Sequence, residues 1–168
     1  MINLEELRPE RFELVARWLS DAEINRWLTS EWRGRIVSTT VVAMAVRNPR
    51  NKMFLILHGD KPCGLAALAD IDMWDHTAMV WYFLGDSSLA GRGIASEAVR
   101  QLACFAFRDM SLSSLYAWVM QDNGPSQRVL QKAGFAPAGR IRRATHSGEQ
   151  QVDRVYFDLL PDLSLARS

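Results

Sequence analysis

One short segment, residues 91–99, constrains this chain more than any other feature. It begins with two glycines and leads into a helix predicted over residues 93–109. The apolar positions of that helix recur at three- and four-residue spacing, at Ile94, Ala95, Ala98, Leu102, Phe105 and Ala106. The first turn of a helix has unpaired backbone N–H groups and the positive end of the peptide dipole. Glycines just ahead of it let an anion approach the bare backbone, so the segment predicts a phosphate-binding site at residues 91–96.

The composition is that of a globular protein, and residues 1–168 are expected to form a single domain. The 168 residues are 48% hydrophobic and 23% charged, with a formal net charge of +1. A chain this close to neutrality has no general attraction for nucleic acid or for an acidic membrane. Cys63 and Cys104 lack the spacing of a metal site or a disulfide framework. The first residues lack the pattern of a secretion signal, and the apolar run 41–46 is too short to span a bilayer. We therefore expect a cytoplasmic protein without a bound metal.

The hydrophobic pattern predicts an α+β chain. Helices are predicted at residues 9–19, from Asp21 to about Leu28, from Ser38 or Thr39 to Arg47, at 93–109 and at 125–132. Strands are predicted at residues 53–58, 64–71, 78–84, 114–120, 135–143 and 152–160. The first three strands form an antiparallel meander, and a strand–helix–strand–helix order follows it.

A glycine pair is compatible with several phosphate sites. The Gly-x-x-x-x-Gly-Lys-Ser/Thr pattern of a P-loop is absent. A dinucleotide-binding fold would place the glycine turn in an early parallel unit, whereas here it follows an antiparallel meander. A turn of small residues that only lets the helix pack closely is the remaining alternative.

A second segment, residues 123–135, decides between these readings. Its pattern, N-x-x-S-x-x-V-L-x-x-x-G-F, lies one strand and one turn beyond the glycine segment. Together the two segments resemble the GNAT superfamily of acyl-CoA N-acyltransferases, and most closely its branch of ribosomal-protein N-terminal and spermidine acetyltransferases. The resemblance implies a mixed, mostly antiparallel sheet flanked by helices, in which the strands around the glycine segment splay apart. Acetyl-CoA would bind in that gap.

The resemblance also implies roles for individual residues. Phe83 and Leu84 would offer backbone groups to the pantetheine arm. Asn123 would bind near the thioester, or simply cap the helix that follows it, and Ser126 would face the departing sulfur, or lie on a helix surface. The backbone expected to hold the pyrophosphate is that of Gly91, Arg92, Gly93, Ile94, Ala95 and Ser96, with added charge from the Arg92 side chain.

The chain departs from the family pattern at three positions. Ala90 replaces a polar residue of the phosphate segment, Leu130 replaces a tyrosine that protonates the thiolate, and Met79 replaces a glutamate base. A primary ammonium must lose its proton before it attacks, so another group is expected to accept it. The candidates for this base are Asp70, Asp72, His76 and Tyr82, with Asp70 and Asp72 sharing one strand face.

The sequence therefore predicts an N-acetyltransferase that moves acetyl from acetyl-CoA to a primary amine by direct attack in a ternary complex. A small-molecule amine, an amino sugar and a protein N-terminus all stay open as acceptors. Trp27, Trp32, Arg33 and Arg35 could line the acceptor mouth, although Trp27 also fits a core face with Ile24 and Leu28. The alternative function is a non-catalytic acyl-CoA sensor or partner module. The expected partners are acetyl-CoA and the amine, with a homodimer left open and no nucleic acid or membrane partner.

Overall fold

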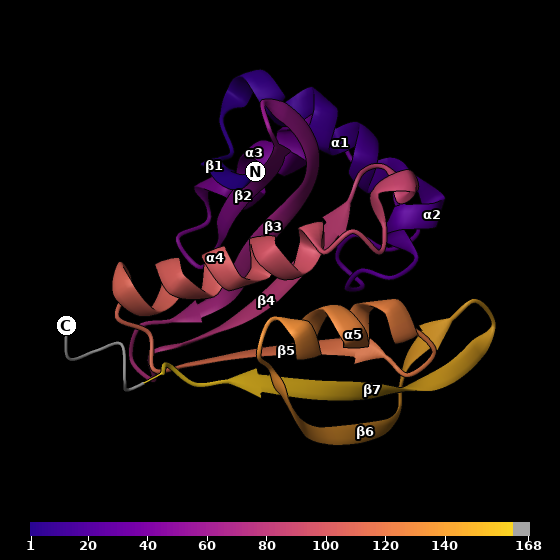
Figure 1. The fold of residues 1–168 in the computed structure, drawn as a ribbon. Coiled ribbons are helices and arrows are strands. Elements are labelled where there is room, and N and C mark those ends of the chain that lie inside the picture. The colour runs from indigo at the N-terminus through magenta and orange to yellow at the C-terminus, as the bar shows by residue number, and fades with distance from the viewer. Residues whose placement is uncertain (163–168) are drawn as a thin grey trace.

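A computed structural model describes residues 1–162 of the chain, and within them seven strands form one sheet in the order β1-β2-β3-β4-β5-β7-β6 (Figure 1). The strands are β1 Ile2–Glu6, β2 Lys52–His58, β3 Lys61–Asp72, β4 Thr77–Leu84, β5 Ser114–Met120, β6 Ala136–Ser147 and β7 Gln150–Leu159. The helices are η1 Pro9–Arg11, α1 Phe12–Ser20, α2 Ala22–Asn25, α3 Thr39–Arg47, η2 Ser87–Leu89, α4 Ile94–Arg108 and α5 Gly124–Lys132. The predicted α+β class and mostly antiparallel sheet are confirmed.

The sheet is covered on both faces. Along β3, Leu65 and Ala67 belong to a core cluster with α1 and α3, whereas Ala66 and Leu68 belong to a second cluster with α4 and α5. Alternate side chains of a strand point to opposite faces, so this one strand contributes to both cores. Figure 1 shows α4 running across the sheet on the face opposite α1–α3.

Strand β1 was not predicted from the sequence. Three of its five residues, Asn3, Glu5 and Glu6, are polar or charged and exposed, so the run carries little hydrophobic signal. It forms by antiparallel pairing with β2, in a register that places Ile2 opposite His58. The free energy that fixes this strand comes from a partner about fifty residues away in the sequence, which a local pattern cannot show.

Strands β4 and β5 are parallel neighbours that separate soon after they meet. They are paired from Thr77 to Met79 on β4 and from Ser114 to Tyr116 on β5, and no pairing continues beyond. The remaining lengths of both strands diverge, as the resemblance predicted. Each strand keeps its outer partner, since β4 pairs with β3 to Leu84 and β5 pairs with β7 to Met120.

The two helices that flank this divergence begin and end as predicted to within one or two residues. Gly93 precedes α4 in the left-handed conformation, with φ of 78°. Asn123 caps α5, Pro125 lies in its first turn, and Gly134 follows it with φ of 99°. Among the described residues, no helix is both long and apolar enough to cross a membrane.

Candidate active site

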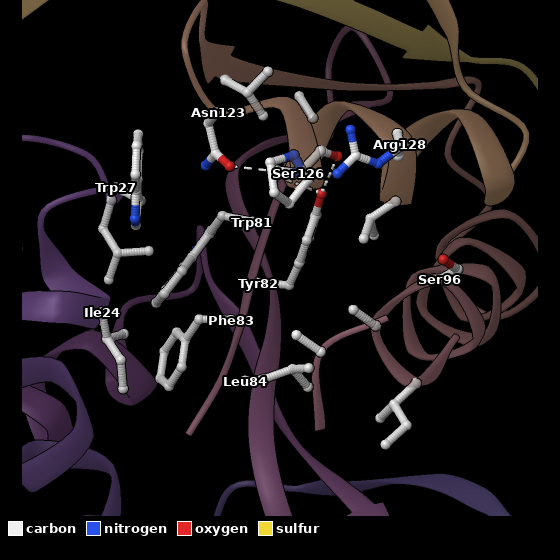
Figure 2. A pocket seen from close by; sticks show the side chains of 18 of the residues that line it. Ile24, Trp27, Trp81, Tyr82, Phe83, Leu84, Ser96, Asn123, Ser126 and Arg128 are labelled. Atoms are coloured by element: carbon white, nitrogen blue, oxygen red, sulfur yellow. Dashed lines mark hydrogen bonds between the residues drawn. The ribbon is translucent and has the colours of Figure 1, made fainter. Parts of the chain in front are cut away.

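A cavity of about 800 Å³ opens where β4 and β5 diverge (Figure 2). Its walls come from α2 and the turn after it, from β4, from the start of α4, from β5 and from α5. The phosphate segment therefore lies at one end of the cavity, and the turn after α2 lies at the other. The described residues contain no group of three or more His, Cys, Asp or Glu that could hold a metal ion.

The phosphate end of the cavity is bare backbone. Gly91 and Gly93 both have positive φ, and a Cβ built on either meets no heavy atom within 4 Å. The first hydrogen bond of α4 runs from the Glu97 N–H to the Gly93 carbonyl, at 3.0 Å. The N–H groups of Ile94, Ala95 and Ser96 precede it, and these three residues line the cavity. An anion fits here, because the open helix end offers several donors and nothing fills it.

Two cations that the sequence analysis missed face this end from α5. Arg128 and Lys132 are four residues apart, so they lie on one side of α5, and both line the cavity. Arg92 was predicted to add positive charge at the phosphate site, but its side chain is exposed and does not line the cavity. The four-residue spacing in α5 was visible in the sequence, but the face that it occupies depends on how α5 packs.

A partly buried hydroxyl pair lies in the middle of the cavity wall. The Tyr82 hydroxyl lies 2.8 Å from Ser126 Oγ and donates a hydrogen bond of 3.0 Å to the Ser126 carbonyl. Figure 2 shows Tyr82 reaching from β4 to Ser126 at the start of α5. Burial raises the pKa of Tyr82 above its ordinary value, and the hydrogen bond with Ser126 offsets only part of that rise. Tyr82 is therefore protonated at neutral pH and cannot be the predicted base.

Asn123 has the cap role considered for it and also lines the cavity. Its Oδ1 accepts a hydrogen bond of 3.3 Å from the Ser126 N–H, which caps α5. The residue also lines the cavity, and Figure 2 shows its side chain facing Trp27 across it. The cap fixes the first turn of α5 and with it the position of Ser126.

Asp70 and Asp72 do not lie at this cavity, so the prediction that they stand near the acceptor is wrong. A bulge follows Ala69, and Asp70 has φ of 49°, which breaks the strand alternation assumed for the pair. The Asp70 carboxylate lies 4.0 Å from Arg50. Asp72 accepts hydrogen bonds from the N–H groups of Asp75 and Trp74, which lower its pKa. Asp72 therefore shapes the tip of the β3–β4 hairpin, and Asp70 faces Arg50 before β2.

The far end of the cavity is aromatic. Trp27, Trp81 and Trp118 line it, together with Leu28 and Thr29. The core role considered for Trp27 is therefore wrong, because its indole forms part of the wall while Leu28 is buried.

Three other residues predicted at the acceptor mouth do not line this cavity. Trp32 is buried, and its ring centroid lies 5.7 Å from that of Trp81. Arg33 and Arg35 are not among the lining residues. Arg33 donates hydrogen bonds to the carbonyls of Leu28, at 3.1 Å, and His146, at 2.8 Å. It thereby joins the loop after α2 to the β6–β7 hairpin.

Comparisons with known proteins agree with this geometry. The family model described as an acetyltransferase (GNAT) domain matches residues 2–136. The uncharacterized N-acetyltransferase p20 of Bacillus licheniformis is 24% identical over 165 residues, 95% of this chain and 92% of the relative. The uncharacterized N-acetyltransferase YnaD of Bacillus subtilis is 22% identical over 163 residues, 95% and 93% of the two chains. The crystal structure of spermidine N-acetyltransferase from Vibrio cholerae with CoA and spermine superposes with a TM-score of 0.84, at 15% identity and 95% coverage of each chain.

Proposed function

Because this chain belongs to the GNAT acetyltransferase family, it is an acetyl-CoA-dependent N-acetyltransferase, and we propose that it acetylates a primary amine by direct attack inside the cavity. One observation carries the proposal. Strands β4 and β5 separate after three paired residues, and the open end of α4 lies at one side of the gap. A long thioester can lie along such a gap with its phosphates on the helix end and its acyl group between the strands.

The donor would be held mainly by backbone groups. Residues 91–96 supply N–H groups for the pyrophosphate, with Arg128 and Lys132 adding positive charge across from them. Phe83 and Leu84 line the cavity where β4 pairs with β3 but no longer with β5, so the edge of β4 that faces the gap can meet the pantetheine amides. The positive charges of Arg128 and Lys132 compensate for the polar side chain that the family pattern has where this chain has Ala90.

Ser126 and Tyr82 are suited to the departing sulfur. The amine nitrogen attacks the thioester carbon, the C–N bond forms, the C–S bond breaks, and the proton lost by nitrogen ends on sulfur. Ser126 Oγ donates a hydrogen bond to the sulfur as negative charge develops there. Tyr82 donates its single hydroxyl proton to the Ser126 carbonyl, and its oxygen lies 2.8 Å from Ser126 Oγ; its raised pKa keeps that proton in place. Ser126 is thus the catalytic residue and Tyr82 the residue that positions it.

The cavity provides little help in deprotonating the amine. Among the described lining residues, the carboxylates are Asp21 and Glu23, and Asp21 already caps α2 through the Glu23 N–H, at 2.8 Å. The amine therefore enters in its neutral form. A primary amine with a pKa near 10 is about one part in a thousand neutral at pH 7, whereas an α-amino group with a pKa near 8 is about one part in ten.

Release of free thiol from acetyl-CoA, measured against a panel of primary amines from pH 6.5 to 9.5, tests the proposal. For an active amine, kcat/KM should rise with pH until it reaches the pKa of that amine. Ser126→Ala should lower kcat by about 100-fold without raising the KM for acetyl-CoA. Ser113→Ala, an exposed serine before β5, is the matched control and should leave kcat unchanged.

Two results would contradict the proposal. Binding of CoA without thiol release for any amine would favour the non-catalytic sensor. An unchanged kcat in Ser126→Ala would leave the transfer in place but would remove this serine from it. Tyr82→Phe separates the catalytic role from the positioning role. If Tyr82 only positions Ser126, Tyr82→Phe should lower kcat less than Ser126→Ala does. In the double variant kcat should equal that of Ser126→Ala alone.

A further inference from the structure

We propose that the amine accepted by this cavity carries a bulky apolar group and no second positive charge. The inference rests on the proposed function, since it names the class of acceptor for that same site. It depends on the aromatic side chains that line the cavity on one face of the sheet, and on two arginines that lie behind them.

The cavity is lined from both faces of the sheet. Along β4, Tyr82 packs with the core cluster that contains α4, whereas Trp81 and Phe83 pack with the cluster that contains α1 and α3. Figure 2 shows these two rings on the same side as Trp27 and away from Arg128. The phosphate end and the aromatic end therefore lie on opposite faces of the sheet, so the amine would meet the thioester from the face that α1–α3 cover.

The aromatic wall is fixed in place by further rings. The ring centroid of Trp81 lies 5.7 Å from that of the buried Trp32 and 6.3 Å from that of Phe83. Trp18 in turn meets Phe83 edge-on, at 6.2 Å. Rings held in such a row lose little freedom when a ligand packs against them, so an apolar group is buried here at little cost in side-chain entropy.

Two indoles of this wall already have an arginine over one face. The guanidinium carbon of Arg154 lies 4.1 Å from the ring centroid of Trp118. That of Arg26 lies 4.6 Å from the ring centroid of Trp27. Both tryptophans line the cavity and neither arginine does, so each guanidinium lies on the side of its indole that is turned away from the cavity. A second cation on the cavity side would be repelled by the first, whereas an uncharged group would not.

The acids of the cavity do not offset this repulsion. Among the described lining residues the carboxylates are Asp21 and Glu23, and both are already engaged. Asp21 Oδ1 accepts a hydrogen bond of 2.8 Å from the Glu23 N–H. The Glu23 carboxylate lies 3.9 Å from the guanidinium of Arg26. Both acids are exposed, so water screens their charge, and a polyamine fits this end less well than an apolar amine does.

Three amines with the same propyl chain test this inference on the full-length protein. Propylamine has no further group, 4,4-dimethylpentylamine ends in a tert-butyl group, and (3-aminopropyl)trimethylammonium ends in a group of the same shape with a permanent positive charge. With acetyl-CoA saturating, kcat/KM is calculated on the neutral primary amine, so that different amine pKa values do not enter. The tert-butyl amine should exceed propylamine by about tenfold through a lower acceptor KM. It should exceed the trimethylammonium amine by about tenfold or more.

Variants of Trp118 assign the apolar preference to the wall. In Trp118→Ala the advantage of the tert-butyl amine over propylamine should fall to about threefold or less, while the KM for acetyl-CoA changes little. Trp118→Phe keeps a ring and should retain most of the preference, which covers the case in which Trp118→Ala does not fold. Trp74→Ala, an exposed indole outside the cavity, is the matched control and should keep the whole preference.

A variant of Arg26 tests the exclusion of the second charge. Arg26→Gln removes the cation over Trp27 and releases the Glu23 carboxylate. It should raise kcat/KM for the trimethylammonium amine by about threefold or more and leave that for the tert-butyl amine unchanged. Arg17→Gln, an exposed arginine on α1 outside the cavity, is the matched control and should change neither value. No gain in Arg26→Gln would mean that the arginine does not exclude a cation.

The outcomes separate the two proposals. A tert-butyl amine no better than propylamine, or an apolar preference that Trp118→Ala retains, would overturn the inference and leave the acetyltransfer proposal intact. A trimethylammonium amine equal to or better than the tert-butyl amine would also overturn it, because the tryptophans would then form a cage for a cation. If no amine releases thiol although CoA binds, both proposals fail together.

Discussion

The two ends of the cavity are built in different ways. The phosphate end is one continuous stretch of backbone, residues 91–96, and its donors are peptide N–H groups. The aromatic end is made of side chains from distant parts of the chain, such as Trp27, Trp81 and Trp118. A site made of local backbone leaves its pattern of glycines and helix positions in the sequence. A site made of side chains brought together by folding does not.

The difference also concerns tolerance to change. Backbone donors at the helix end are present whatever side chains surround them, provided that nothing fills the space above Gly91 and Gly93. At the aromatic end, each contact depends on the identity of a single side chain. We therefore expect the phosphate end to be disrupted by adding atoms and the aromatic end by removing them.

The largest expected effect is at Gly93, where an added charge would compete with the phosphate. Its φ of 78° is one that Asn and Asp adopt more readily than other residues with a side chain. Gly93→Asp should weaken CoA binding by about 100-fold relative to Gly93→Asn, because a carboxylate so close to the pyrophosphate repels it. Isothermal titration with CoA measures the difference.

Gly93→Asn is the matched control, since it adds nearly the same atoms without the charge. Equal affinities in the two variants would mean that no phosphate lies at the start of α4. That result would remove the basis of the comparison between the two ends.

Most of the fold and one end of the site could be predicted from the sequence. Hydrophobic periodicity and the residues at helix ends located α4 and α5 and all strands except β1, because each of these signals is local. The divergence of β4 and β5 came from the family resemblance, because no pattern within either strand encodes it.

The parts that could not be predicted depend on tertiary contacts. Asp70 and Asp72 alternate in the sequence, but a bulge after Ala69 changes where they point, and a bulge has no simple sequence signal. Tyr82 was considered as a base because its burial could not be foreseen, and burial reverses that role. Arg154 was not considered at all, because only the pairing of β7 with β5 brings it beside Trp118.

A smaller effect is expected at Trp27, on the aromatic end. Trp27→Ala should raise the acceptor KM by about tenfold while the KM for acetyl-CoA stays within about twofold, because the indole covers the amine and not the phosphates. Trp74→Ala is the matched control, since Trp74 is 92% exposed at the β3–β4 turn and outside the cavity. Initial rates with each substrate varied in turn separate the two constants. A rise confined to acetyl-CoA would show that the two ends have been assigned the wrong way round.

The smallest effect concerns Tyr82, which is partly buried and lies between the two ends of the cavity. Its pKa is raised in the folded protein, so folding favours the neutral phenol. The stabilisation is complete below the unfolded-state pKa of about 10 and is lost as the pH rises above it, by up to about 1.4 kcal/mol per pH unit. Urea unfolding of the wild type and of Tyr82→Phe between pH 9 and 11 measures this loss of stability. Tyr116 and Tyr156 are present in both proteins, so their contributions cancel in the difference. The stability of the wild type relative to the variant should fall above about pH 10. If the free energies of unfolding of the two proteins changed in parallel with pH, the phenol would be accessible to solvent. The cavity wall around Tyr82 would then be as open as the two ends on either side of it.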